Sequence, residues 1–329
     1  MSQKKKQAWF VQAVGIMISI VCMVYIVRQI NPQELKAALV NFNWVYLAVG
    51  LGSLSIGYVL RIIRWGVMLR SAKAHVNNIQ CAAPFLGSIA LNNVLPLRAG
   101  DVMRAFIFPA SMGVHVSTST ASLFLERLLD LVTLLLCLAT GLYFSQHVVL
   151  PDSIKTSIFV LAIIAFCLFF FMLVFHHGVM MLVKHVAAWS VRRGYAKLEK
   201  LFIFVADFFK RLSEMITVRH LIRIFGLSLC IWVFEAGLFK AILDGLHLEV
   251  GVLDVLGIMA IATLATLVPS SPGYVGPFHL VAYSALAAFH VSVSDAASFA
   301  IITHLALWVP TTLAGAVAIL ANRQLFQGV

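Results

Sequence analysis

Six charged residues lie in stretches that are otherwise apolar, and the spacing of some of them places pairs on one helix face. They form two groups: Arg98, Asp101 and Arg104 in the first, and Glu126, Arg127 and Asp130 in the second. Residues three or four positions apart lie on one face of a helix. Asp101 and Arg104 are therefore expected to face the same way, and so are the two acids of the second group. Two stacked carboxylates repel each other unless a cation lies between them, and Arg98 or Arg104 could supply that cation.

Two interpretations of these charges stay open. In the first, they form a buried network that holds one helical segment against another. In the second, the arginines face a cavity and bind a phosphate group, because a planar guanidinium donates two parallel hydrogen bonds to phosphate oxygens. The interpretations also combine, with carboxylates that orient and arginines that bind. Glu235 and Lys240, in another apolar stretch, are secondary candidates.

The composition explains why charges in these stretches are informative. Of the 329 residues, 61% are hydrophobic and 11% are charged, whereas a soluble globular domain carries about 25% charged residues. This contrast excludes a water-soluble protein and indicates a membrane protein with several spans. A charge at the centre of a span costs at least about 2.5–3.5 kcal/mol, so such a residue faces a partner or a cavity.

The excess of basic residues has two explanations in a membrane protein. Lys and Arg number 24 against 13 Asp and Glu, a net charge of +11. This indicates first that the basic loops face the cytoplasm and second that the protein attracts anionic lipid headgroups, rather than that it binds nucleic acid.

The five cysteines are isolated and show no CxxC spacing, so neither a disulfide framework nor a zinc site is indicated. The sequence predicts no metal and no other cofactor.

The expected fold is an all-α polytopic membrane protein, one membrane domain over residues 1–329. About six stretches are long and apolar enough to be full spans: 8–27, 44–63, 118–144, 156–176, 221–244 and 296–320. The first of them is retained as a span because it is long for a signal peptide and lacks a clear cleavage site. Two further apolar stretches, 79–112 and 252–291, are interrupted.

Proline and glycine cause both interruptions, since proline lacks a backbone donor and glycine permits unusual backbone angles. The interrupting residues are Pro96 and Gly100 in the first stretch, and Pro269, Pro272, Gly273 and Gly276 in the second. Each interruption is expected to end one half-helix and begin another. Such backbone is tolerated at membrane depth only inside protein or beside a water-filled cavity. The sequence therefore predicts two re-entrant broken-helix hairpins.

The two hairpins are expected to form an inverted repeat. Pro96 precedes Gly100 by four residues, as Pro269 precedes Gly273, and three spans lie between the two stretches. An odd number of spans inverts the second unit, a plan that recurs in secondary transporters. Two hairpins that arose separately are the alternative.

Charged loops predict the orientation. Segments 61–75 and 184–223 are rich in Lys and Arg and are expected to be cytoplasmic, with residues 4–6 and Arg323. Both termini are then cytoplasmic, and the acids on the other side are Glu34, Asp152, Asp244, Glu249 and Asp254. The first hairpin would enter from the cytoplasm and the second from outside. Residues 179–215 are expected to form an amphipathic helix on the cytoplasmic leaflet, or a connector that packs on the bundle.

The second interruption offers neutral hydrogen-bonding groups. Ser270, Ser271 and the backbone near Gly273 can donate and accept, and a half-helix that starts near Pro277 would direct its positive N-terminal end toward a cavity. His279 lies in the first turn of that half-helix. A lone histidine is more often structural, although this one could sense protons.

Together these motifs resemble a known family. They read Asn92-Asn93-x-Leu95-Pro96-x-Arg98-x-Gly100-Asp101-x-x-Arg104, then Glu126-Arg127-x-x-Asp130, then Pro269-x-x-Pro272-Gly273-x-x-Gly276, with Arg61-x-x-Arg64-Trp65 upstream. The pattern covers nearly the whole chain and is similar to the lysylphosphatidylglycerol synthase transmembrane, or flippase-like, family. The best-known members fuse this domain to a cytoplasmic aminoacyltransferase and are associated with moving aminoacylated phosphatidylglycerol across the bilayer. Stand-alone members are implicated in transport of other lipids, including hopanoids and polyprenyl-linked intermediates.

The resemblance implies a lipid flippase of the inner, or cytoplasmic, membrane that moves a phospholipid or a polyprenyl-phosphate-linked lipid. The motif residues and the neutral groups of the second interruption together give the expected substrate-binding residues, which are Arg61, Arg64, Asn93, Arg98, Asp101, Arg104, Glu126, Arg127, Asp130, Ser270, Ser271, Gly273 and His279, with hinges at Pro96, Gly100, Pro269, Pro272 and Gly276. Two departures matter. The chain ends after its last span, so synthase activity is not implied, and His279 stands where the family often has an acidic residue.

Other functions are weighed against transport. An intramembrane protease could use Asp101 and Asp130, but residues 98–101 lack the first glycine of a GxGD pattern, and motifs of a lipid-modifying enzyme are incomplete. A non-transporting subunit that presents a lipid to an enzyme is the third possibility. No GxxxxGK[ST] loop occurs, so transport would be unpowered or driven by a gradient. The expected partners are membrane lipids, with a homo-oligomer or a lipid-synthesis partner left open, and the protein is expected not to be an enzyme.

Overall fold

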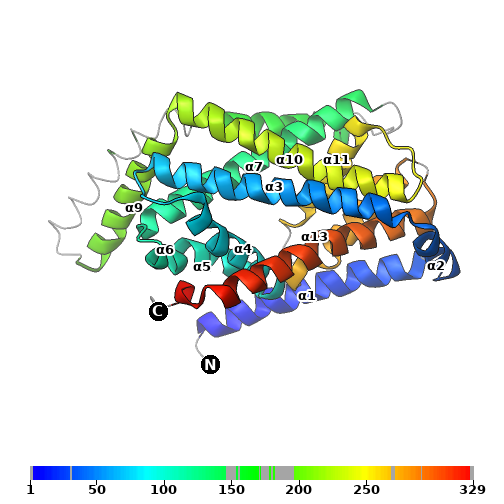
Figure 1. The fold of residues 1–329 in the computed structure, drawn as a ribbon, viewed down its shortest axis with the longest axis horizontal. Coiled ribbons are helices and arrows are strands. Elements are labelled where there is room, and N and C mark those ends of the chain that lie inside the picture. The colour runs from blue at the N-terminus through cyan, green and yellow to red at the C-terminus, as the bar shows by residue number, and fades with distance from the viewer. Residues whose placement is uncertain are drawn as a thin grey trace.

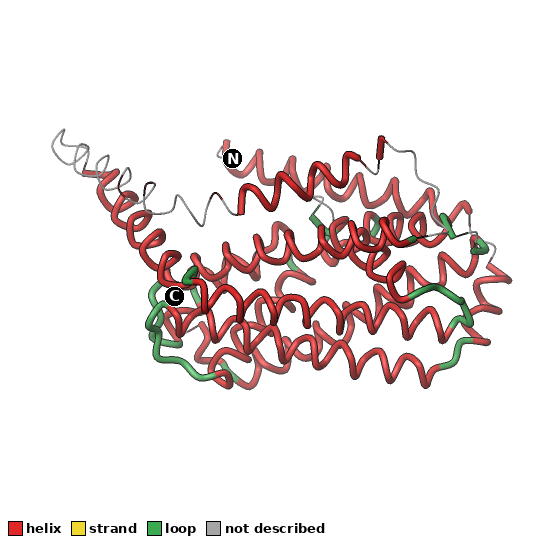
Figure 2. Tube along the Cα trace, turned by 90° about the horizontal axis from the view of Figure 1, so that it is seen from above, coloured by secondary structure: helices red, strands yellow, loops and turns green. Residues whose placement is uncertain are grey.

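The computed structural model describes residues 3–29, 32–145, 153–154, 156–169, 171, 178, 181, 196–267, 271–289 and 291–326. Within these residues the secondary structure is helical and contains no strand. Long helices lie side by side along one axis of an elongated bundle (Figures 1 and 2). The prediction of an all-α membrane protein is confirmed.

Among the described residues, five helices of 27 to 29 residues run the length of the bundle: α1 (Gln3–Gln29), α3 (Trp44–Ser71), α7 (Val116–Phe144), α10 (Val218–Gly245) and α13 (Val293–Ala321). The shorter elements α2 (Pro32–Asn41), α6 (Phe108–Ser111) and α9 (Ala196–Met215) lie between them in the chain, and the 3-10 turn η3 (Arg323–Phe326) follows α13. Side chains cap several helices where the sequence supplies Asn or Ser. For example, Asn43 accepts a hydrogen bond from the Val45 N–H (3.1 Å), and Ser292 accepts one from the Asp295 N–H (3.1 Å).

By length and composition, three of the described helices can cross a membrane alone, namely α3, α10 and α13. The bent pair of α1 and α2 would make a fourth span. Helix α7 is as long as α13, but its central turns contain three charged residues, Glu126, Arg127 and Asp130, and it is not among these three helices. The predicted span 156–176 is described as a 14-residue helix, Thr156–Phe169, and its remainder lies largely outside the described residues. The count of six spans therefore stays a prediction.

Two helical hairpins complete the bundle. The first consists of α4 (Asn78–Val94), the 3-10 turn η1 (Pro96–Arg98) and α5 (Ala99–Phe106), and the second of α11 (Val252–Ala265), η2 (Pro272–Tyr274) and α12 (Pro277–Ala287). In the first hairpin the two helices are in close contact. A Cβ atom on Gly100 would lie 1.8 Å from the Ser88 carbonyl oxygen, so only glycine permits this approach.

The hairpins enter from opposite ends of the bundle. The start of α4 lies beside the end of α3, where Arg70 donates to Asn78 (3.0 Å), and α6, just after α5, lies beside η3, with the Phe108 and Phe326 rings 5.6 Å apart. At the other end, α13 begins next to α2, where Ser294 donates to Glu34 (2.5 Å). The second hairpin starts and finishes at this end, between the last turn of α10 and the first turn of α13.

The backbone conformation at the two hairpin tips aligns the two halves of the repeat differently from the sequence spacing. Leu97 and Arg98, which follow Pro96, have left-handed φ values of 59° and 52°. In the second hairpin the residues with φ of 73° and 60° are Gly273 and Tyr274, which follow Pro272. Pro96 therefore corresponds to Pro272, and Gly100 to Gly276, rather than to Pro269 and Gly273 as the sequence spacing suggested. The spacing misled because both prolines of the second motif have a glycine four residues later.

Charge is distributed unevenly between the ends. The basic residues Arg70, Lys73, Arg219 and Arg323 lie at the end that holds both termini (Figure 1), together with the acids Asp207 and Glu214, and the acidic residues Glu34, Asp244, Glu249 and Asp254 lie at the other end, together with Arg28 and Lys36. Helix α9 lies at the basic end and covers part of the predicted amphipathic segment 179–215; residues 179, 180 and 182–195 fall outside the described part. Its aromatic face packs on α7, with the Phe124 and Phe208 rings 5.8 Å apart. Asp152 also falls outside the described residues.

Candidate functional site

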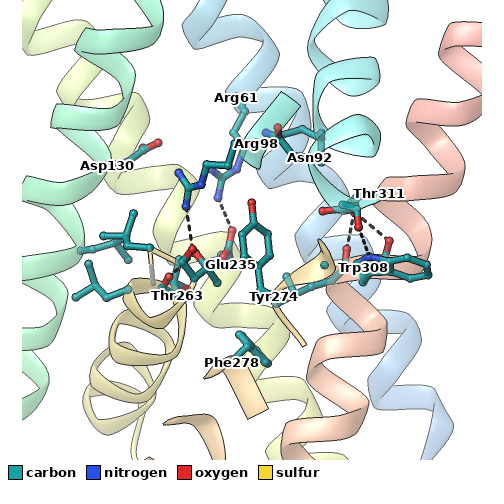
Figure 3. Close-up of a pocket in the computed structure, with 18 of the residues that line it drawn as sticks. Arg61, Asn92, Arg98, Asp130, Glu235, Thr263, Tyr274, Phe278, Trp308 and Thr311 are labelled. Atoms are coloured by element: carbon teal, nitrogen blue, oxygen red, sulfur yellow. Dashed lines mark hydrogen bonds and ion pairs between the residues drawn. The ribbon is translucent and has the colours of Figure 1, made fainter. Parts of the chain in front are cut away.

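A cavity of about 420 Å³ lies where the tips of the two hairpins meet. Helices α3, α7, α10 and α13 contribute lining residues from their central turns, for example Arg61, Asp130, Trp232 and Leu307. The cavity is therefore at mid-depth of the bundle, with both hairpin tips in its wall (Figure 3). Its volume falls within the range of small-molecule sites, about 300–1,000 Å³.

Arg98 connects the two tips. Its guanidinium donates a hydrogen bond to the Thr266 carbonyl oxygen (3.0 Å), at the end of α11, and lies 5.7 Å from the centre of the Tyr274 ring. Arg98 and Tyr274 occupy the same position in the two halves of the repeat, and both have left-handed backbones. Non-glycine residues in this conformation cost about 1–3 kcal/mol each, so they persist where surrounding structure holds them. In this left-handed conformation both side chains line the cavity.

Arg61 projects from α3 into the cavity beside two aromatic rings. It forms an ion pair with Glu235 of α10, and its guanidinium lies 4.7 Å from the Trp232 ring and 5.5 Å from the Tyr58 ring. Such cation–π contacts are worth about 0.5–2 kcal/mol. Glu235 therefore neutralises Arg61, and the aromatic rings hold it in place.

Arg64 lies one turn further along α3, behind the cavity wall. It is fully buried, donates to both carboxylate oxygens of Asp130 (2.7 and 3.2 Å) and also donates to Ser228 (2.8 Å). Asp130 itself lines the cavity. The cation that compensates Asp130 is therefore Arg64 of the upstream Arg61-x-x-Arg64 motif. The expectation that the first hairpin would supply this cation is wrong.

Arg127 lines the cavity and pairs with Asp101 of α5. One of its terminal nitrogens lies 2.9 and 3.0 Å from the two Asp101 oxygens. Asn92 also donates to Asp101 (2.9 Å), and its own side-chain oxygen accepts from the Asp101 N–H (3.0 Å). Asp101 is therefore held by two helices and orients Arg127.

Arg104 and Glu126 form a pair outside the cavity. Arg104 is fully buried, lies 2.8 Å from Glu126 and packs on the faces of Trp65 (5.3 Å) and Phe85 (4.8 Å). The second oxygen of Glu126 is buried without a hydrogen-bond partner among the described residues. This pair joins α5 to α7 and fits the structural interpretation of the charges.

The second hairpin presents histidine and backbone groups. The Nε2 atom of His304 lies 2.7 Å from the Gly273 carbonyl oxygen, which requires a proton on Nε2, and its ring lies 4.5 Å from that of His279. The Gly276 N–H donates to the His279 Nδ1 (3.4 Å). The Ser271 N–H donates to the Ser19 hydroxyl of α1 (2.9 Å). These groups hold the tip, and α12 itself contributes Phe278 to the cavity wall.

The structure thus divides the predicted site residues. Those that line the cavity are Arg61, Asn93, Arg98, Arg127, Asp130 and Gly273. Those that lie behind it are Arg64, Asp101, Arg104, Glu126, Ser271 and His279. The predicted residues Pro269 and Ser270 fall outside the described residues. Asn93 donates to Thr311 (3.1 Å) and Thr312 (2.9 Å), so its amide ties α4 to α13.

Several lining residues were not predicted. The polar and aromatic ones are Tyr58, Asn92, Trp232, Thr263, Thr266, Tyr274, Phe278, His304, Trp308 and Thr311, and Glu235 was only a secondary candidate. Most are aromatic or neutral polar residues within apolar helices, where they resemble ordinary core residues. A signal was available for two of them, since Trp232 and Glu235 lie three apart and so share a face of α10. The other secondary candidate, Lys240, pairs with Asp244 toward the end of that helix.

The comparison with known proteins matches this architecture to a family. The model described as "Lysylphosphatidylglycerol synthase TM region" covers residues 12–315. The chain belongs to this family. The match includes both hairpins and every residue that lines the cavity.

Two relatives show how far the likeness extends. A "UPF0104 membrane protein" from Methanothermobacter thermautotrophicus is 22% identical over 304 residues, which are 87% of this chain and 88% of that protein. The "Glycosyltransferase AglD" of Haloferax volcanii is 27% identical over 124 residues, 36% of this chain and 19% of the glycosyltransferase. No solved structure matches the chain. The family resemblance deduced from the motifs is therefore confirmed, and it extends over nearly the whole membrane domain.

Proposed function

We propose that this protein is a lipid transporter that moves a phospholipid or a polyprenyl-phosphate-linked lipid across the cytoplasmic membrane. The observation that carries the proposal is the mid-depth cavity with Arg98 in its wall, between two oppositely inserted hairpins. Broken helices that meet near the midplane are where secondary transporters bind their substrates. Membership of a family named for a phospholipid synthase supports lipid as the cargo.

The pairing of the carboxylates supports binding over catalysis. Asp101 and Asp130 could form the acid pair of an intramembrane protease only if they shared a proton. Each is instead paired with a guanidinium, Asp101 with Arg127 and Asp130 with Arg64. A carboxylate paired with a guanidinium in this way orients its partner rather than a second acid.

The charge division supports an orientation with both termini in the cytoplasm. A green fluorescent protein fused to the C-terminus is expected to fluoresce, because it folds in the cytoplasm, and alkaline phosphatase at that position is expected to be inactive. The same reporters placed between His247 and Gly251, in the loop between α10 and α11, serve as the control and should give the opposite pattern. Active phosphatase at the C-terminus would show that the orientation is reversed.

Transport is tested with purified protein in vesicles that contain a fluorescent phospholipid or polyprenyl-phosphate lipid. A membrane-impermeant quencher measures how fast label leaves the inner leaflet. We expect movement by the wild type, slowed about tenfold or more in Arg98→Ala, because a hydrogen bond to a charged group contributes about 1.5–3 kcal/mol.

Arg223→Ala is the matched control for this experiment. Arg223 is an exposed arginine near the start of α10, away from the cavity, so its loss should leave the rate unchanged. If no lipid of either class moves, or if Arg98→Ala transports at the wild-type rate, the proposed function is wrong.

A further inference from the structure

Arg98 differs from the other arginines at the cavity in its partner. Arg61 pairs with Glu235, and Arg127 pairs with Asp101. Arg98 forms no ion pair with any carboxylate in the described part of the chain; its acceptor is the neutral Thr266 carbonyl. A backbone carbonyl accepts a hydrogen bond but does not cancel the charge of a guanidinium.

The charges around the cavity therefore do not balance. The five arginines at this depth are Arg61, Arg64, Arg98, Arg104 and Arg127, and the four carboxylates are Asp101, Glu126, Asp130 and Glu235. Among the residues that the structure describes, each of these carboxylates has its own arginine, so a single positive charge is left, and it is on Arg98. A net charge at membrane depth is costly unless a counter-ion compensates it.

From this balance, and resting on the proposed function, we infer that the cavity selects a lipid whose headgroup is an anionic phosphodiester, with one net negative charge and no cationic group. The guanidinium of Arg98 can donate two parallel hydrogen bonds to the two unesterified oxygens of a phosphodiester, and the single negative charge of the phosphodiester makes the site neutral. To bind it, Arg98 exchanges its hydrogen bond with Thr266 for one with the phosphate. Arg98 is thereby the residue that determines specificity for charge.

Other headgroup charges fit this cavity less well. A zwitterionic headgroup also has a phosphodiester, but its ammonium cancels the phosphate charge, so the net charge of the site stays at +1. A phosphomonoester or a diphosphate brings additional negative charge into a cavity whose wall already contains Asp130 and Glu235. Like charges at close range in a medium of low dielectric repel strongly. The selection therefore comes from repulsion of excess charge as well as from attraction.

Two lipid classes share the selected chemistry. Phosphatidylglycerol is a glycerophospholipid with one phosphodiester, and a polyprenyl-phosphate-linked sugar is a polyprenyl lipid with one phosphodiester. Polyprenyl phosphate is the corresponding monoester, and phosphatidylethanolamine is the zwitterion. Movement of these four lipids is compared in vesicles of neutral phosphatidylcholine, each labelled on its tail.

The wild type is expected to move at least one of the two phosphodiesters about tenfold or more faster than the monoester and the zwitterion. The faster of the two phosphodiesters shows whether the substrate is a glycerophospholipid or a polyprenyl lipid. Equal rates for zwitterionic phosphatidylethanolamine and the two anionic phosphodiesters would overturn the inference while leaving the proposed transport intact. Movement of no lipid would instead contradict the proposed function itself.

A charge change in the wall provides the sharper test. Glu235→Gln removes the partner of Arg61 and leaves two uncompensated arginines at the cavity. The preference is then expected to shift toward the monoester, with the ratio of monoester to phosphodiester rates rising about tenfold. Arg98→Lys should keep the wild-type preference, because the charge is retained, and Arg98→Gln should lose it.

Asp244→Asn is the matched control. It removes a carboxylate from the same helix, where Asp244 pairs with Lys240 away from the cavity, and should leave the preference unchanged. Folding of each variant is checked by gel filtration, and the wild-type comparison of four lipids stands even if a variant does not fold. An unchanged preference in folded Glu235→Gln, or a retained preference in folded Arg98→Gln, would overturn the inference.

Discussion

Replacing Arg104 with methionine is expected to lower the free energy of unfolding by about 3–5 kcal/mol, because it leaves a buried carboxylate without its counter-charge. Arg104 and Glu126 are both almost completely buried and lie 2.8 Å apart. The nearby Arg127 is 4.0 Å from Glu126 and is already occupied by Asp101, so it compensates only in part. Reversible unfolding in mixed detergent micelles measures the loss.

The double variant Arg104→Met/Glu126→Leu separates charge from packing. It removes both charges and is expected to recover most of the stability lost in the single variant, since replacing a buried ion pair by apolar residues is often neutral. Arg223→Met, which alters an exposed arginine, is the control and should have little effect. If the double variant is as unstable as Arg104→Met, then Arg104 acts through its packing on Trp65 and Phe85 rather than through its charge.

Gly100→Ala is expected to prevent closure of the first hairpin. The new Cβ would lie 1.8 Å from the Ser88 carbonyl oxygen and 2.8 Å from the Asn92 side-chain oxygen, so α5 must move away from α4. Overpacking of this kind costs about 1–3 kcal/mol and occasionally more, and the shift also breaks the bonds between Asn92 and Asp101. We expect loss of most folded protein, measured as the monodisperse fraction after detergent extraction.

Gly52→Ala is the comparison for that experiment. Gly52 lies in the interior of α3 with nothing within 4 Å of the added Cβ. Alanine has a higher helix propensity than glycine, so this variant should be as stable as the wild type or slightly more stable. Normal yield of Gly100→Ala would show that α4 and α5 can separate without cost.

The tertiary structure also reassigns the partners of the six charges. Sequence spacing placed a cation from the first hairpin between Glu126 and Asp130. Arg104 does form an ion pair with Glu126, but Asp130 is paired with Arg64, which is 66 residues away in the chain. Helical spacing identifies residues that share a face on one helix. It cannot tell which residue of another helix lies opposite, because that depends on how the helices pack.

The sequence by itself determined the all-α membrane class, the two broken hairpins and the family, because these follow from composition, from proline and glycine, and from local motifs. It also identified the residues whose charge is costly in an apolar chain, Arg98 among them. Only the tertiary structure decided that Pro96 corresponds to Pro272, that aromatic rings surround Arg61, and that Arg98 alone of the cavity arginines forms no ion pair with a described carboxylate. The physical reason is that charge compensation and a cavity wall arise between segments distant in sequence, and no local pattern specifies which segments meet.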